Sequence, residues 1–318
     1  MLRQVILAAA AAGVALAGQP HCDRDCMIHL TDQYLAALIK HNPAGLPLAR
    51  GVRFTENTAE IPVGDGLWVG ASEAPTTFKI YAVDPASSQV GFYGVMKENG
   101  RPLIIALRLK VIDGEITEIE HVLARNLRPD RMQNLITPRA AFLANVPPGQ
   151  RTSREDMLNA ANSYFEAIEH GNGKLAPFAE DCERHENGGQ TTHNAKPVPW
   201  PVPMGSPADD HAMAILGTLT CTAQVDSGIL SFITRLWPRR LAIVDEQKGL
   251  VLAFPMFQHR GAVHDIKIKG VPGVDVVHMN GGTSNLQAGE IFKIRAGKIH
   301  EIEAMGVSLP YGTKSGWN

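Results

Sequence analysis

Apolar residues recur at helical spacing in two segments that begin 130 residues apart, at Met27 and at Met157. Residues three or four apart lie on the same face of an α-helix, so each segment predicts an amphipathic helix. Ser153 is well placed as the N-cap of the second helix. The matching apolar positions are Met27, Leu30, Tyr34 and Leu38 in the first segment and Met157, Ala160, Tyr164 and Ile168 in the second.

Strict alternation of apolar and polar residues also occurs twice. Residues 107–122 alternate on both sides of Asp113-Gly114, and residues 291–305 alternate on both sides of Ala296-Gly297. A tight-turn dipeptide between two alternating segments predicts a β-hairpin. The two hairpins are separated by 183 residues, so the second copy of the pattern contains 53 additional residues.

A short extended segment follows each predicted helix. The sequences "GVRFTEN" (51–57) and "CERHENG" (182–188) both contain a Glu-Asn pair, and the two pairs are again 130 residues apart. Three matching elements in the same order indicate an internal duplication. We predict a first domain over 22–126, a linker over 127–150 and a second domain over 151–318, with insertions near 188–240 and 258–288.

Helices that precede a series of strands predict an α+β fold in which each sheet packs around its helices. The helix "LTDQYLAALIKHNPAGL", the strand "VRFTEN" and the hairpin "LRLKVIDGEITEIEH" together resemble the nuclear-transport-factor-two-like superfamily. Ketosteroid isomerase, limonene epoxide hydrolase, scytalone dehydratase and SnoaL-like polyketide cyclases belong to that superfamily. The resemblance implies two tandem cone-shaped domains, each a curved antiparallel sheet wrapped around N-terminal helices. It also implies association through the sheets, as a homodimer or between the two copies in one chain.

The N-terminus and the cysteines bear on the compartment. Residues 1–17 combine a basic start, an apolar run and a small-x-small end, which predicts a signal peptide; a retained anchor is the alternative. We therefore expect a secreted or periplasmic protein that has no membrane segment after cleavage. Four cysteines in such a chain favour two disulfides over a zinc site. Among three possible pairings we prefer Cys22–Cys26 with Cys182–Cys221.

Two glutamates are candidates for proton transfer. Glu56 shares a strand face with Val52 and Phe54, which places its carboxyl at the end of an apolar core, where desolvation raises a pKa. Glu186 shares a face with Arg184 in the second copy. The resemblance to ketosteroid isomerase, whose general base ends the corresponding strand, implies a proton-moving role for both glutamates. The alternative is a structural role for the Glu-Asn pair in capping a turn.

Other polar residues gather in the second copy. We expect His185, His193, Asp226 and His259 to join Glu186 and Glu56 as catalytic candidates, with Asp226 at the start of an inserted helix. Substrate-binding candidates are Arg184, Trp200 and Phe257. The histidines have no recognised metal-ligand spacing, so we expect no metal. Nucleotide-binding and serine-hydrolase motifs do not occur, and we expect no cofactor.

The charge balance narrows the choice of partners. Thirty basic residues against thirty-two acidic ones leave no strong field for nucleic acid. The sequence therefore predicts an exported, cofactor-free acid–base enzyme, a lyase, isomerase or hydrolase, that acts on a small, partly apolar molecule. The alternative is a non-catalytic periplasmic module that binds a small molecule or another protein.

Overall fold

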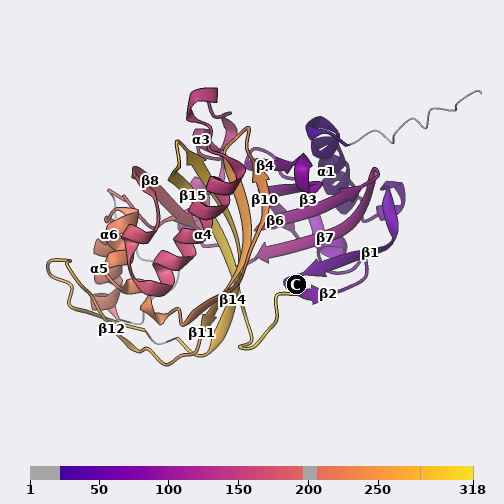
Figure 1. Cartoon of the computed structure of the whole chain (residues 1–318). Coiled ribbons are helices and arrows are strands. Elements are labelled where there is room, and N and C mark those ends of the chain that lie inside the picture. Colours follow the sequence, from indigo (N-terminus) through magenta and orange to yellow (C-terminus); the bar gives the residue numbers. More distant parts are fainter. Residues whose placement is uncertain (1–21, 196–205, 280, 318) are drawn as a thin grey trace, which may run out of the picture.

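The computed structural model describes residues 22–195, 206–279 and 281–317. The predicted signal peptide and Trp200 lie outside these residues. Within them, no helix is long and apolar enough to cross a membrane. The fold is mixed α+β, with two large curled sheets, their helices and a small two-stranded sheet (Figure 1).

The first half contains two α-helices and seven strands. Its elements are α1 (Arg24–Ile39), β1 (Leu48–Glu56), β2 (Ala59–Glu60), α2 (Leu67–Gly70), β3 (Ala71–Glu73), β4 (Lys79–Asp84), β5 (Gln89–Glu98), β6 (Arg101–Ile112) and β7 (Glu115–Ala124). The strands are ordered β2-β1-β7-β6-β5-β3, and β4 also pairs with β5. The predicted hairpin is confirmed as β6 and β7, with Asp113 and Gly114 at positive φ in its turn.

The second half follows a linker that contains α3 (Ala140–Leu143). Its elements are α4 (Arg154–His170), β8 (Phe178–Glu186), β9 (Gly189–Gln190), α5 (Pro207–Leu216), α6 (Cys221–Asp226), β10 (Arg235–Asp245), β11 (Leu250–His259), β12 (Asp265–Lys267), β13 (Val276–His278), β14 (Ser284–Arg295) and β15 (Lys298–Leu309). The Ser153 side chain caps α4 by accepting a hydrogen bond from Asp156 N, as predicted. The order β9-β8-β15-β14-β11-β10 repeats the order of the first sheet.

Each sheet is mixed, whereas the sequence predicted antiparallel sheets. Strand β1 pairs with β7 in parallel, and β8 pairs with β15 in parallel. Side-chain alternation fixes which face of a strand is buried, but it contains no information on strand direction. Because β1 joins the last strand of its half after a long connection, either direction is compatible with its sequence.

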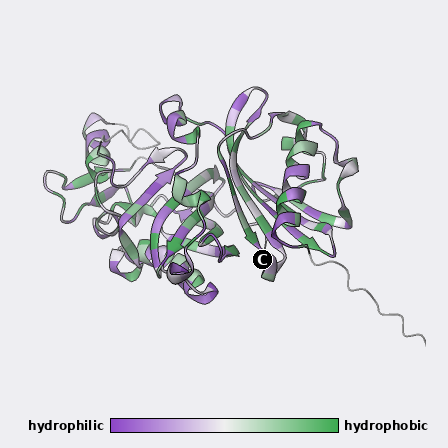
Figure 2. Cartoon of the chain, turned by 90° about the horizontal axis from the view of Figure 1, so that it is seen from above, coloured by the Kyte–Doolittle hydropathy of each residue, from purple (hydrophilic) through white to green (hydrophobic). Residues whose placement is uncertain are grey.

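Three groups of apolar residues hold these layers together. One core lies between α1 and the first sheet, and another lies between α4 and the second sheet. A third core joins the two sheets, where Ile80 and Ala106 of the first half pack with Leu252 and Ile291 of the second. Figure 2 shows hydrophobic and hydrophilic residues interleaved along the strands of both halves, as the alternation predicted.

Matching ion pairs cross between the halves. Arg24 at the start of α1 donates two hydrogen bonds to Asp245, at 2.9 and 2.8 Å. Arg154 at the start of α4 donates two to Asp84, at 2.8 and 2.7 Å. Arg24 and Arg154 begin the equivalent helices α1 and α4, and Asp84 and Asp245 end β4 and β10, which pair with β5 and β11 in the two sheets. The two halves therefore contact one another through equivalent surfaces.

Both preferred disulfides are confirmed. Cys22, which lies just before α1, is bonded to Cys26 in the first turn of α1. Cys182 on β8 is bonded to Cys221, the first residue of α6. The second disulfide attaches the inserted segment to the sheet. It thereby holds the residues around positions 229–233 over the second core.

Candidate functional site

A cavity of about 500 Å³ lies in the second half. It is bounded by α4, by strands β8, β11, β14 and β15, and by the two inserted segments. This volume is within the range of small-molecule sites, which are mostly apolar with a few placed polar groups. Its apolar walls include Ile168, Leu230, Phe232, Ile233, Phe257 and Leu286.

Four polar side chains form the buried end of the cavity: Tyr164, Arg184, Glu186 and Glu290. Arg184 Nη1 lies 2.9 Å from Glu186 Oε2, and its Nη2 lies 3.7 Å from Glu290 Oε1. Arg184 Nε donates a hydrogen bond of 2.9 Å to the Tyr164 hydroxyl. One guanidinium is therefore placed between two carboxyl groups inside a mostly apolar cavity.

Glu290 differs from Glu186 in its surroundings. Its side chain is 1% exposed, compared with 20% for Glu186. Oε2 of Glu290 is buried and has no hydrogen-bond partner among the described residues. Burial raises the pKa of Glu290 to about 7, with the Arg184 charge opposing this and the Glu186 charge adding to it. At neutral pH this carboxyl therefore populates both its acid and its carboxylate form.

Arg184 makes many contacts of its own. Besides Tyr164 and the two carboxyls, its Nη1 donates a hydrogen bond of 3.2 Å to Thr191 Oγ1. The buried guanidinium is strongly held in its charged form, and its pKa is raised despite its burial because of Tyr164 and the two glutamates. The site consequently has a fixed positive charge that is already paired.

His259 lies at the less buried part of the cavity. It is the last residue of β11, and its Nδ1 lies 3.3 Å from the Ser284 hydroxyl. Burial lowers the pKa of His259, and the Glu186 charge opposes that change. The imidazole is therefore mostly neutral at pH 7 and able to accept or donate a proton.

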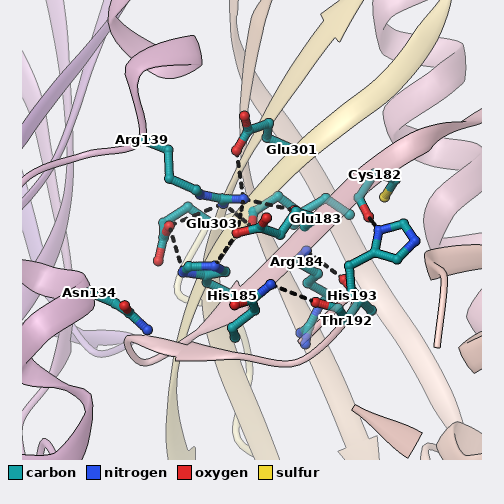
Figure 3. Close-up of polar contacts among 12 residues, drawn as sticks. Asn134, Arg139, Cys182, Glu183, Arg184, His185, Thr192, His193, Glu301 and Glu303 are labelled. Atoms are coloured by element: carbon teal, nitrogen blue, oxygen red, sulfur yellow. Dashed lines mark hydrogen bonds and ion pairs between the residues drawn. The ribbon is translucent and has the colours of Figure 1, made fainter. Parts of the chain in front are cut away.

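The structure brings together four of the residues that the sequence singled out: Glu186, His259, Arg184 and Phe257 all line the cavity. His185 lies on the opposite face of β8, where its Nε2 is 2.6 Å from Glu183 Oε1 and where Arg139 from the linker contacts Glu303 (Figure 3). Strand alternation separates it from its neighbours Arg184 and Glu186.

Two further candidates have structural contacts outside the cavity lining. The ring Nδ1 of His193 lies 2.9 Å from the Cys182 carbonyl oxygen, as Figure 3 shows. Asp226 ends α6, whereas the sequence predicted it at a helix start; Thr220 caps the helix, which begins at Cys221. The Asp226 carboxylate accepts a hydrogen bond of 2.7 Å from Gly173 N and so fixes the turn after α4.

Glu56 in the first half is tightly held. Its carboxylate accepts hydrogen bonds from Leu67 N at 2.7 Å and from Arg125 at 2.9 Å. Burial alone raises the pKa of Glu56, but the His121 ring, Arg125 and Leu67 N together lower it to about 2. The sequence predicts that desolvation raises the pKa of Glu56, but the hydrogen bonds and charges of these donors outweigh desolvation and lower the pKa. At neutral pH Glu56 is therefore an ionised and fully bonded carboxylate.

The asparagines of the repeated Glu-Asn pairs have the same structural role in both halves. Asn57 and Asn187 are at positive φ, 45° and 46°. The side-chain oxygen of Asn57 accepts a hydrogen bond from Leu123 N, and that of Asn187 accepts one from Gly306 N. Each asparagine thus joins the end of the first strand of its half to the last strand. The asparagine of the repeated pair therefore has a structural role.

Sequence reasoning did not identify Glu290 or Tyr164 as functional candidates. The inward positions of β14 are occupied by Leu286, Ala288, Glu290, Phe292 and Ile294. A single carboxylate in an otherwise apolar stripe is costly unless it has a function or a partner, and this pattern was visible in the sequence. Tyr164 was assigned to the apolar face of its helix. Its hydroxyl reaches Arg184, a contact that follows only from tertiary structure.

Among the described residues, no group of three or more histidine, cysteine, aspartate or glutamate side chains is arranged to hold a metal ion.

A family model described as a domain of unknown function (DUF8021) matches residues 150–306. This range covers most of the second half and includes Tyr164, Arg184, Glu186 and Glu290. No curated protein matches the chain. The match to the family model therefore lies in the half that contains the cavity.

Proposed function

We propose that this protein is an exported, cofactor-free acid–base enzyme that acts on a small, partly apolar molecule in the second half. The observation that carries this proposal is Glu290, a buried carboxyl that lines the apolar cavity and has its pKa raised by burial to about 7. A general acid or base is most effective when its pKa lies near the working pH. A carboxyl that served only the fold would be expected to have both of its oxygens bonded.

The two carboxyl groups are suited to different steps. Glu290 in its acid form can donate a proton to an oxygen of the substrate. Glu186, paired with Arg184 and less deeply buried, can accept a proton from a carbon or from a water molecule. Such a division between two carboxyls in unlike surroundings is a known route to acid–base catalysis. A dehydration, an isomerisation and an addition of water are all compatible with it.

The resemblance found in the sequence supports the same proposal. The repeated strand order supports the arrangement of two tandem cone-shaped domains that the resemblance implies, with the equivalent ion pairs joining them as a pseudo-dimer. The two disulfides are consistent with an exported protein.

The test is a screen of the purified protein against neutral ketones, epoxides and hydroxylated aromatic compounds. Thermal shift would detect binding, and mass spectrometry would detect conversion. We expect wild type to convert a compound that Glu290→Gln and Glu186→Gln bind but convert at least about 100-fold more slowly, which is the size of effect typical of a lost proton carrier. Glu115→Gln, on the exposed hairpin of the first half, is the matched control and should keep full activity.

The same screen examines the alternative of a non-catalytic binding module. A compound that binds wild type, Glu290→Gln and Glu186→Gln equally, and that none of them converts, would contradict the enzyme proposal. Equal conversion by Glu290→Gln and wild type would also contradict it.

A further inference from the structure

The charges at the buried end of the cavity restrict what can bind there. The donors of Arg184 are directed at Glu186, Tyr164, Thr191 and Glu290. An anionic ligand would have to displace a carboxylate or a hydroxyl to reach this guanidinium. With Glu290 in its acid form, Glu186 already balances the charge of Arg184, so the site has no net positive charge that would attract an added anion.

A cationic ligand meets a different obstacle. It would need Glu290 in its ionised form, deep in an apolar cavity and with the Arg184 guanidinium 3.7 Å away. Repulsion between ligand and guanidinium is strong where water is excluded. The charges around Glu290 therefore disfavour both anionic and cationic ligands.

The remaining groups around Glu290 do not change this balance. On the neighbouring strands, Ala253 of β11 and Ala304 of β15 stand opposite it. Tyr164 of α4 stays protonated because burial raises its pKa, and His259 is mostly neutral because burial lowers its pKa. From the first half, Tyr93 lies in the core between the two sheets, and burial raises its pKa as well.

What Glu290 lacks is a hydrogen-bond partner for Oε2. This atom is buried, and the residue lines the cavity. A buried polar atom without a partner destabilises the protein, and a ligand that supplies the partner removes that cost. In the acid form the carboxyl can donate one hydrogen bond, and a ligand oxygen can accept it.

We propose that the cavity binds an uncharged ligand through an oxygen that accepts a hydrogen bond from the carboxylic acid form of Glu290, so that binding takes up a proton wherever free Glu290 is ionised. The chemical class is an apolar ketone, ether, epoxide or alcohol, and it excludes carboxylic acids and amines. This inference rests on the proposed function only in that both concern the same cavity, because it requires binding and no turnover.

The experiment uses isothermal titration calorimetry with the full chain and three probes of similar shape: cyclohexyl methyl ketone, cyclohexanecarboxylate and cyclohexylmethylamine. We expect the ketone to bind at about pH 6 and its dissociation constant to rise about tenfold per pH unit above about pH 7, as linkage to one proton requires. Titrations in two buffers with different ionisation heats would measure the proton uptake at about pH 8.

Variants of Glu290 separate this effect from a change in folding. Glu290→Gln is similar in shape and always has an N–H to donate, so it should bind the ketone with an affinity that does not change with pH. Glu290→Leu removes the donor and should lose at least about tenfold in ketone affinity at about pH 6, as expected for one buried hydrogen bond.

The outcomes are distinct from those of the turnover screen. Tighter binding of the amine than of the ketone, or ketone affinity that is independent of pH in wild type, would overturn the inference while leaving catalysis open. Ketone binding with the expected pH dependence, together with no conversion of any compound, would support the inference and contradict the proposed function.

Discussion

Replacing Glu290 by glutamine should change how the stability of the protein depends on pH. The folded-state pKa of Glu290 is raised to about 7, from an ordinary value of 4.5. Between these values the unfolded chain has lost its proton while the folded protein keeps it, so the contribution of Glu290 to stability is full below about pH 4.5 and is lost as the pH rises to about 7. The difference in pKa corresponds to about 3 kcal/mol. Relative to wild type, Glu290→Gln should therefore gain about 3 kcal/mol between about pH 4 and about pH 8.

Urea denaturation of both proteins at several pH values measures this difference directly. Titrating groups far from Glu290, Glu56 included, contribute equally to the two proteins and cancel. Glu115→Gln, at an exposed position of the first hairpin, is the control and should run parallel to wild type. A constant difference between Glu290→Gln and wild type across this range would refute the argument, because it would mean that burial does not retain the proton on Glu290. A difference that shifts in favour of wild type as the pH rises would refute it as well.

Three further changes test the fold around the site. Replacing Cys182 and Cys221 together by alanine opens a link across 39 residues and should cost about 4 kcal/mol in the free energy of unfolding; an unchanged denaturation midpoint would contradict this. Arg24→Ala leaves the buried Asp245 without its cation and should cost about 3 kcal/mol, measured in the same way, whereas Arg24→Lys should cost less. Glu56→Gln should destabilise the protein at pH 7, and its deficit should shrink as the pH falls from about 4.5 towards 2, because the pKa of Glu56 is lowered to about 2. A deficit of Glu56→Gln that grows on acidification would contradict this contribution.

Local patterns predicted the elements of the fold well. The apolar spacing from Met27 and Met157 and the two alternating hairpins correspond to observed helices and strands, because helix and strand periods follow directly from backbone geometry. The preferred disulfide pairing, one of three possible pairings, was also confirmed. The parallel pairing of β1 with β7 did not, since the direction of a distant strand depends on the path of the whole half.

The candidate site was only partly predictable, for a related reason. Glu186 and Arg184 were found together because they are two residues apart on one strand face. Glu290 comes from a strand more than 100 residues later, and only the folded sheet places it next to Arg184. His185 was selected for its proximity in sequence to Glu186, but adjacent residues of a strand point to opposite faces. Neighbours in sequence are therefore a poor guide to a site on a sheet.

The duplication explains why one half contains this site and the other does not. At the positions that correspond to Arg184 and Glu290, the first half has Phe54 and Leu107, both fully buried in its apolar core. The first half keeps the equivalent glutamate, Glu56, but without a cation and a second carboxyl inside the core it is bonded by Arg125 at the edge of the sheet. At these two positions, apolar residues of a packed core in the first half are matched by charged residues that line a cavity in the second half. Because a buried Arg–Glu pair is rarely more stable than the apolar pair it replaces, stability alone does not account for Arg184 and Glu290 in the second half.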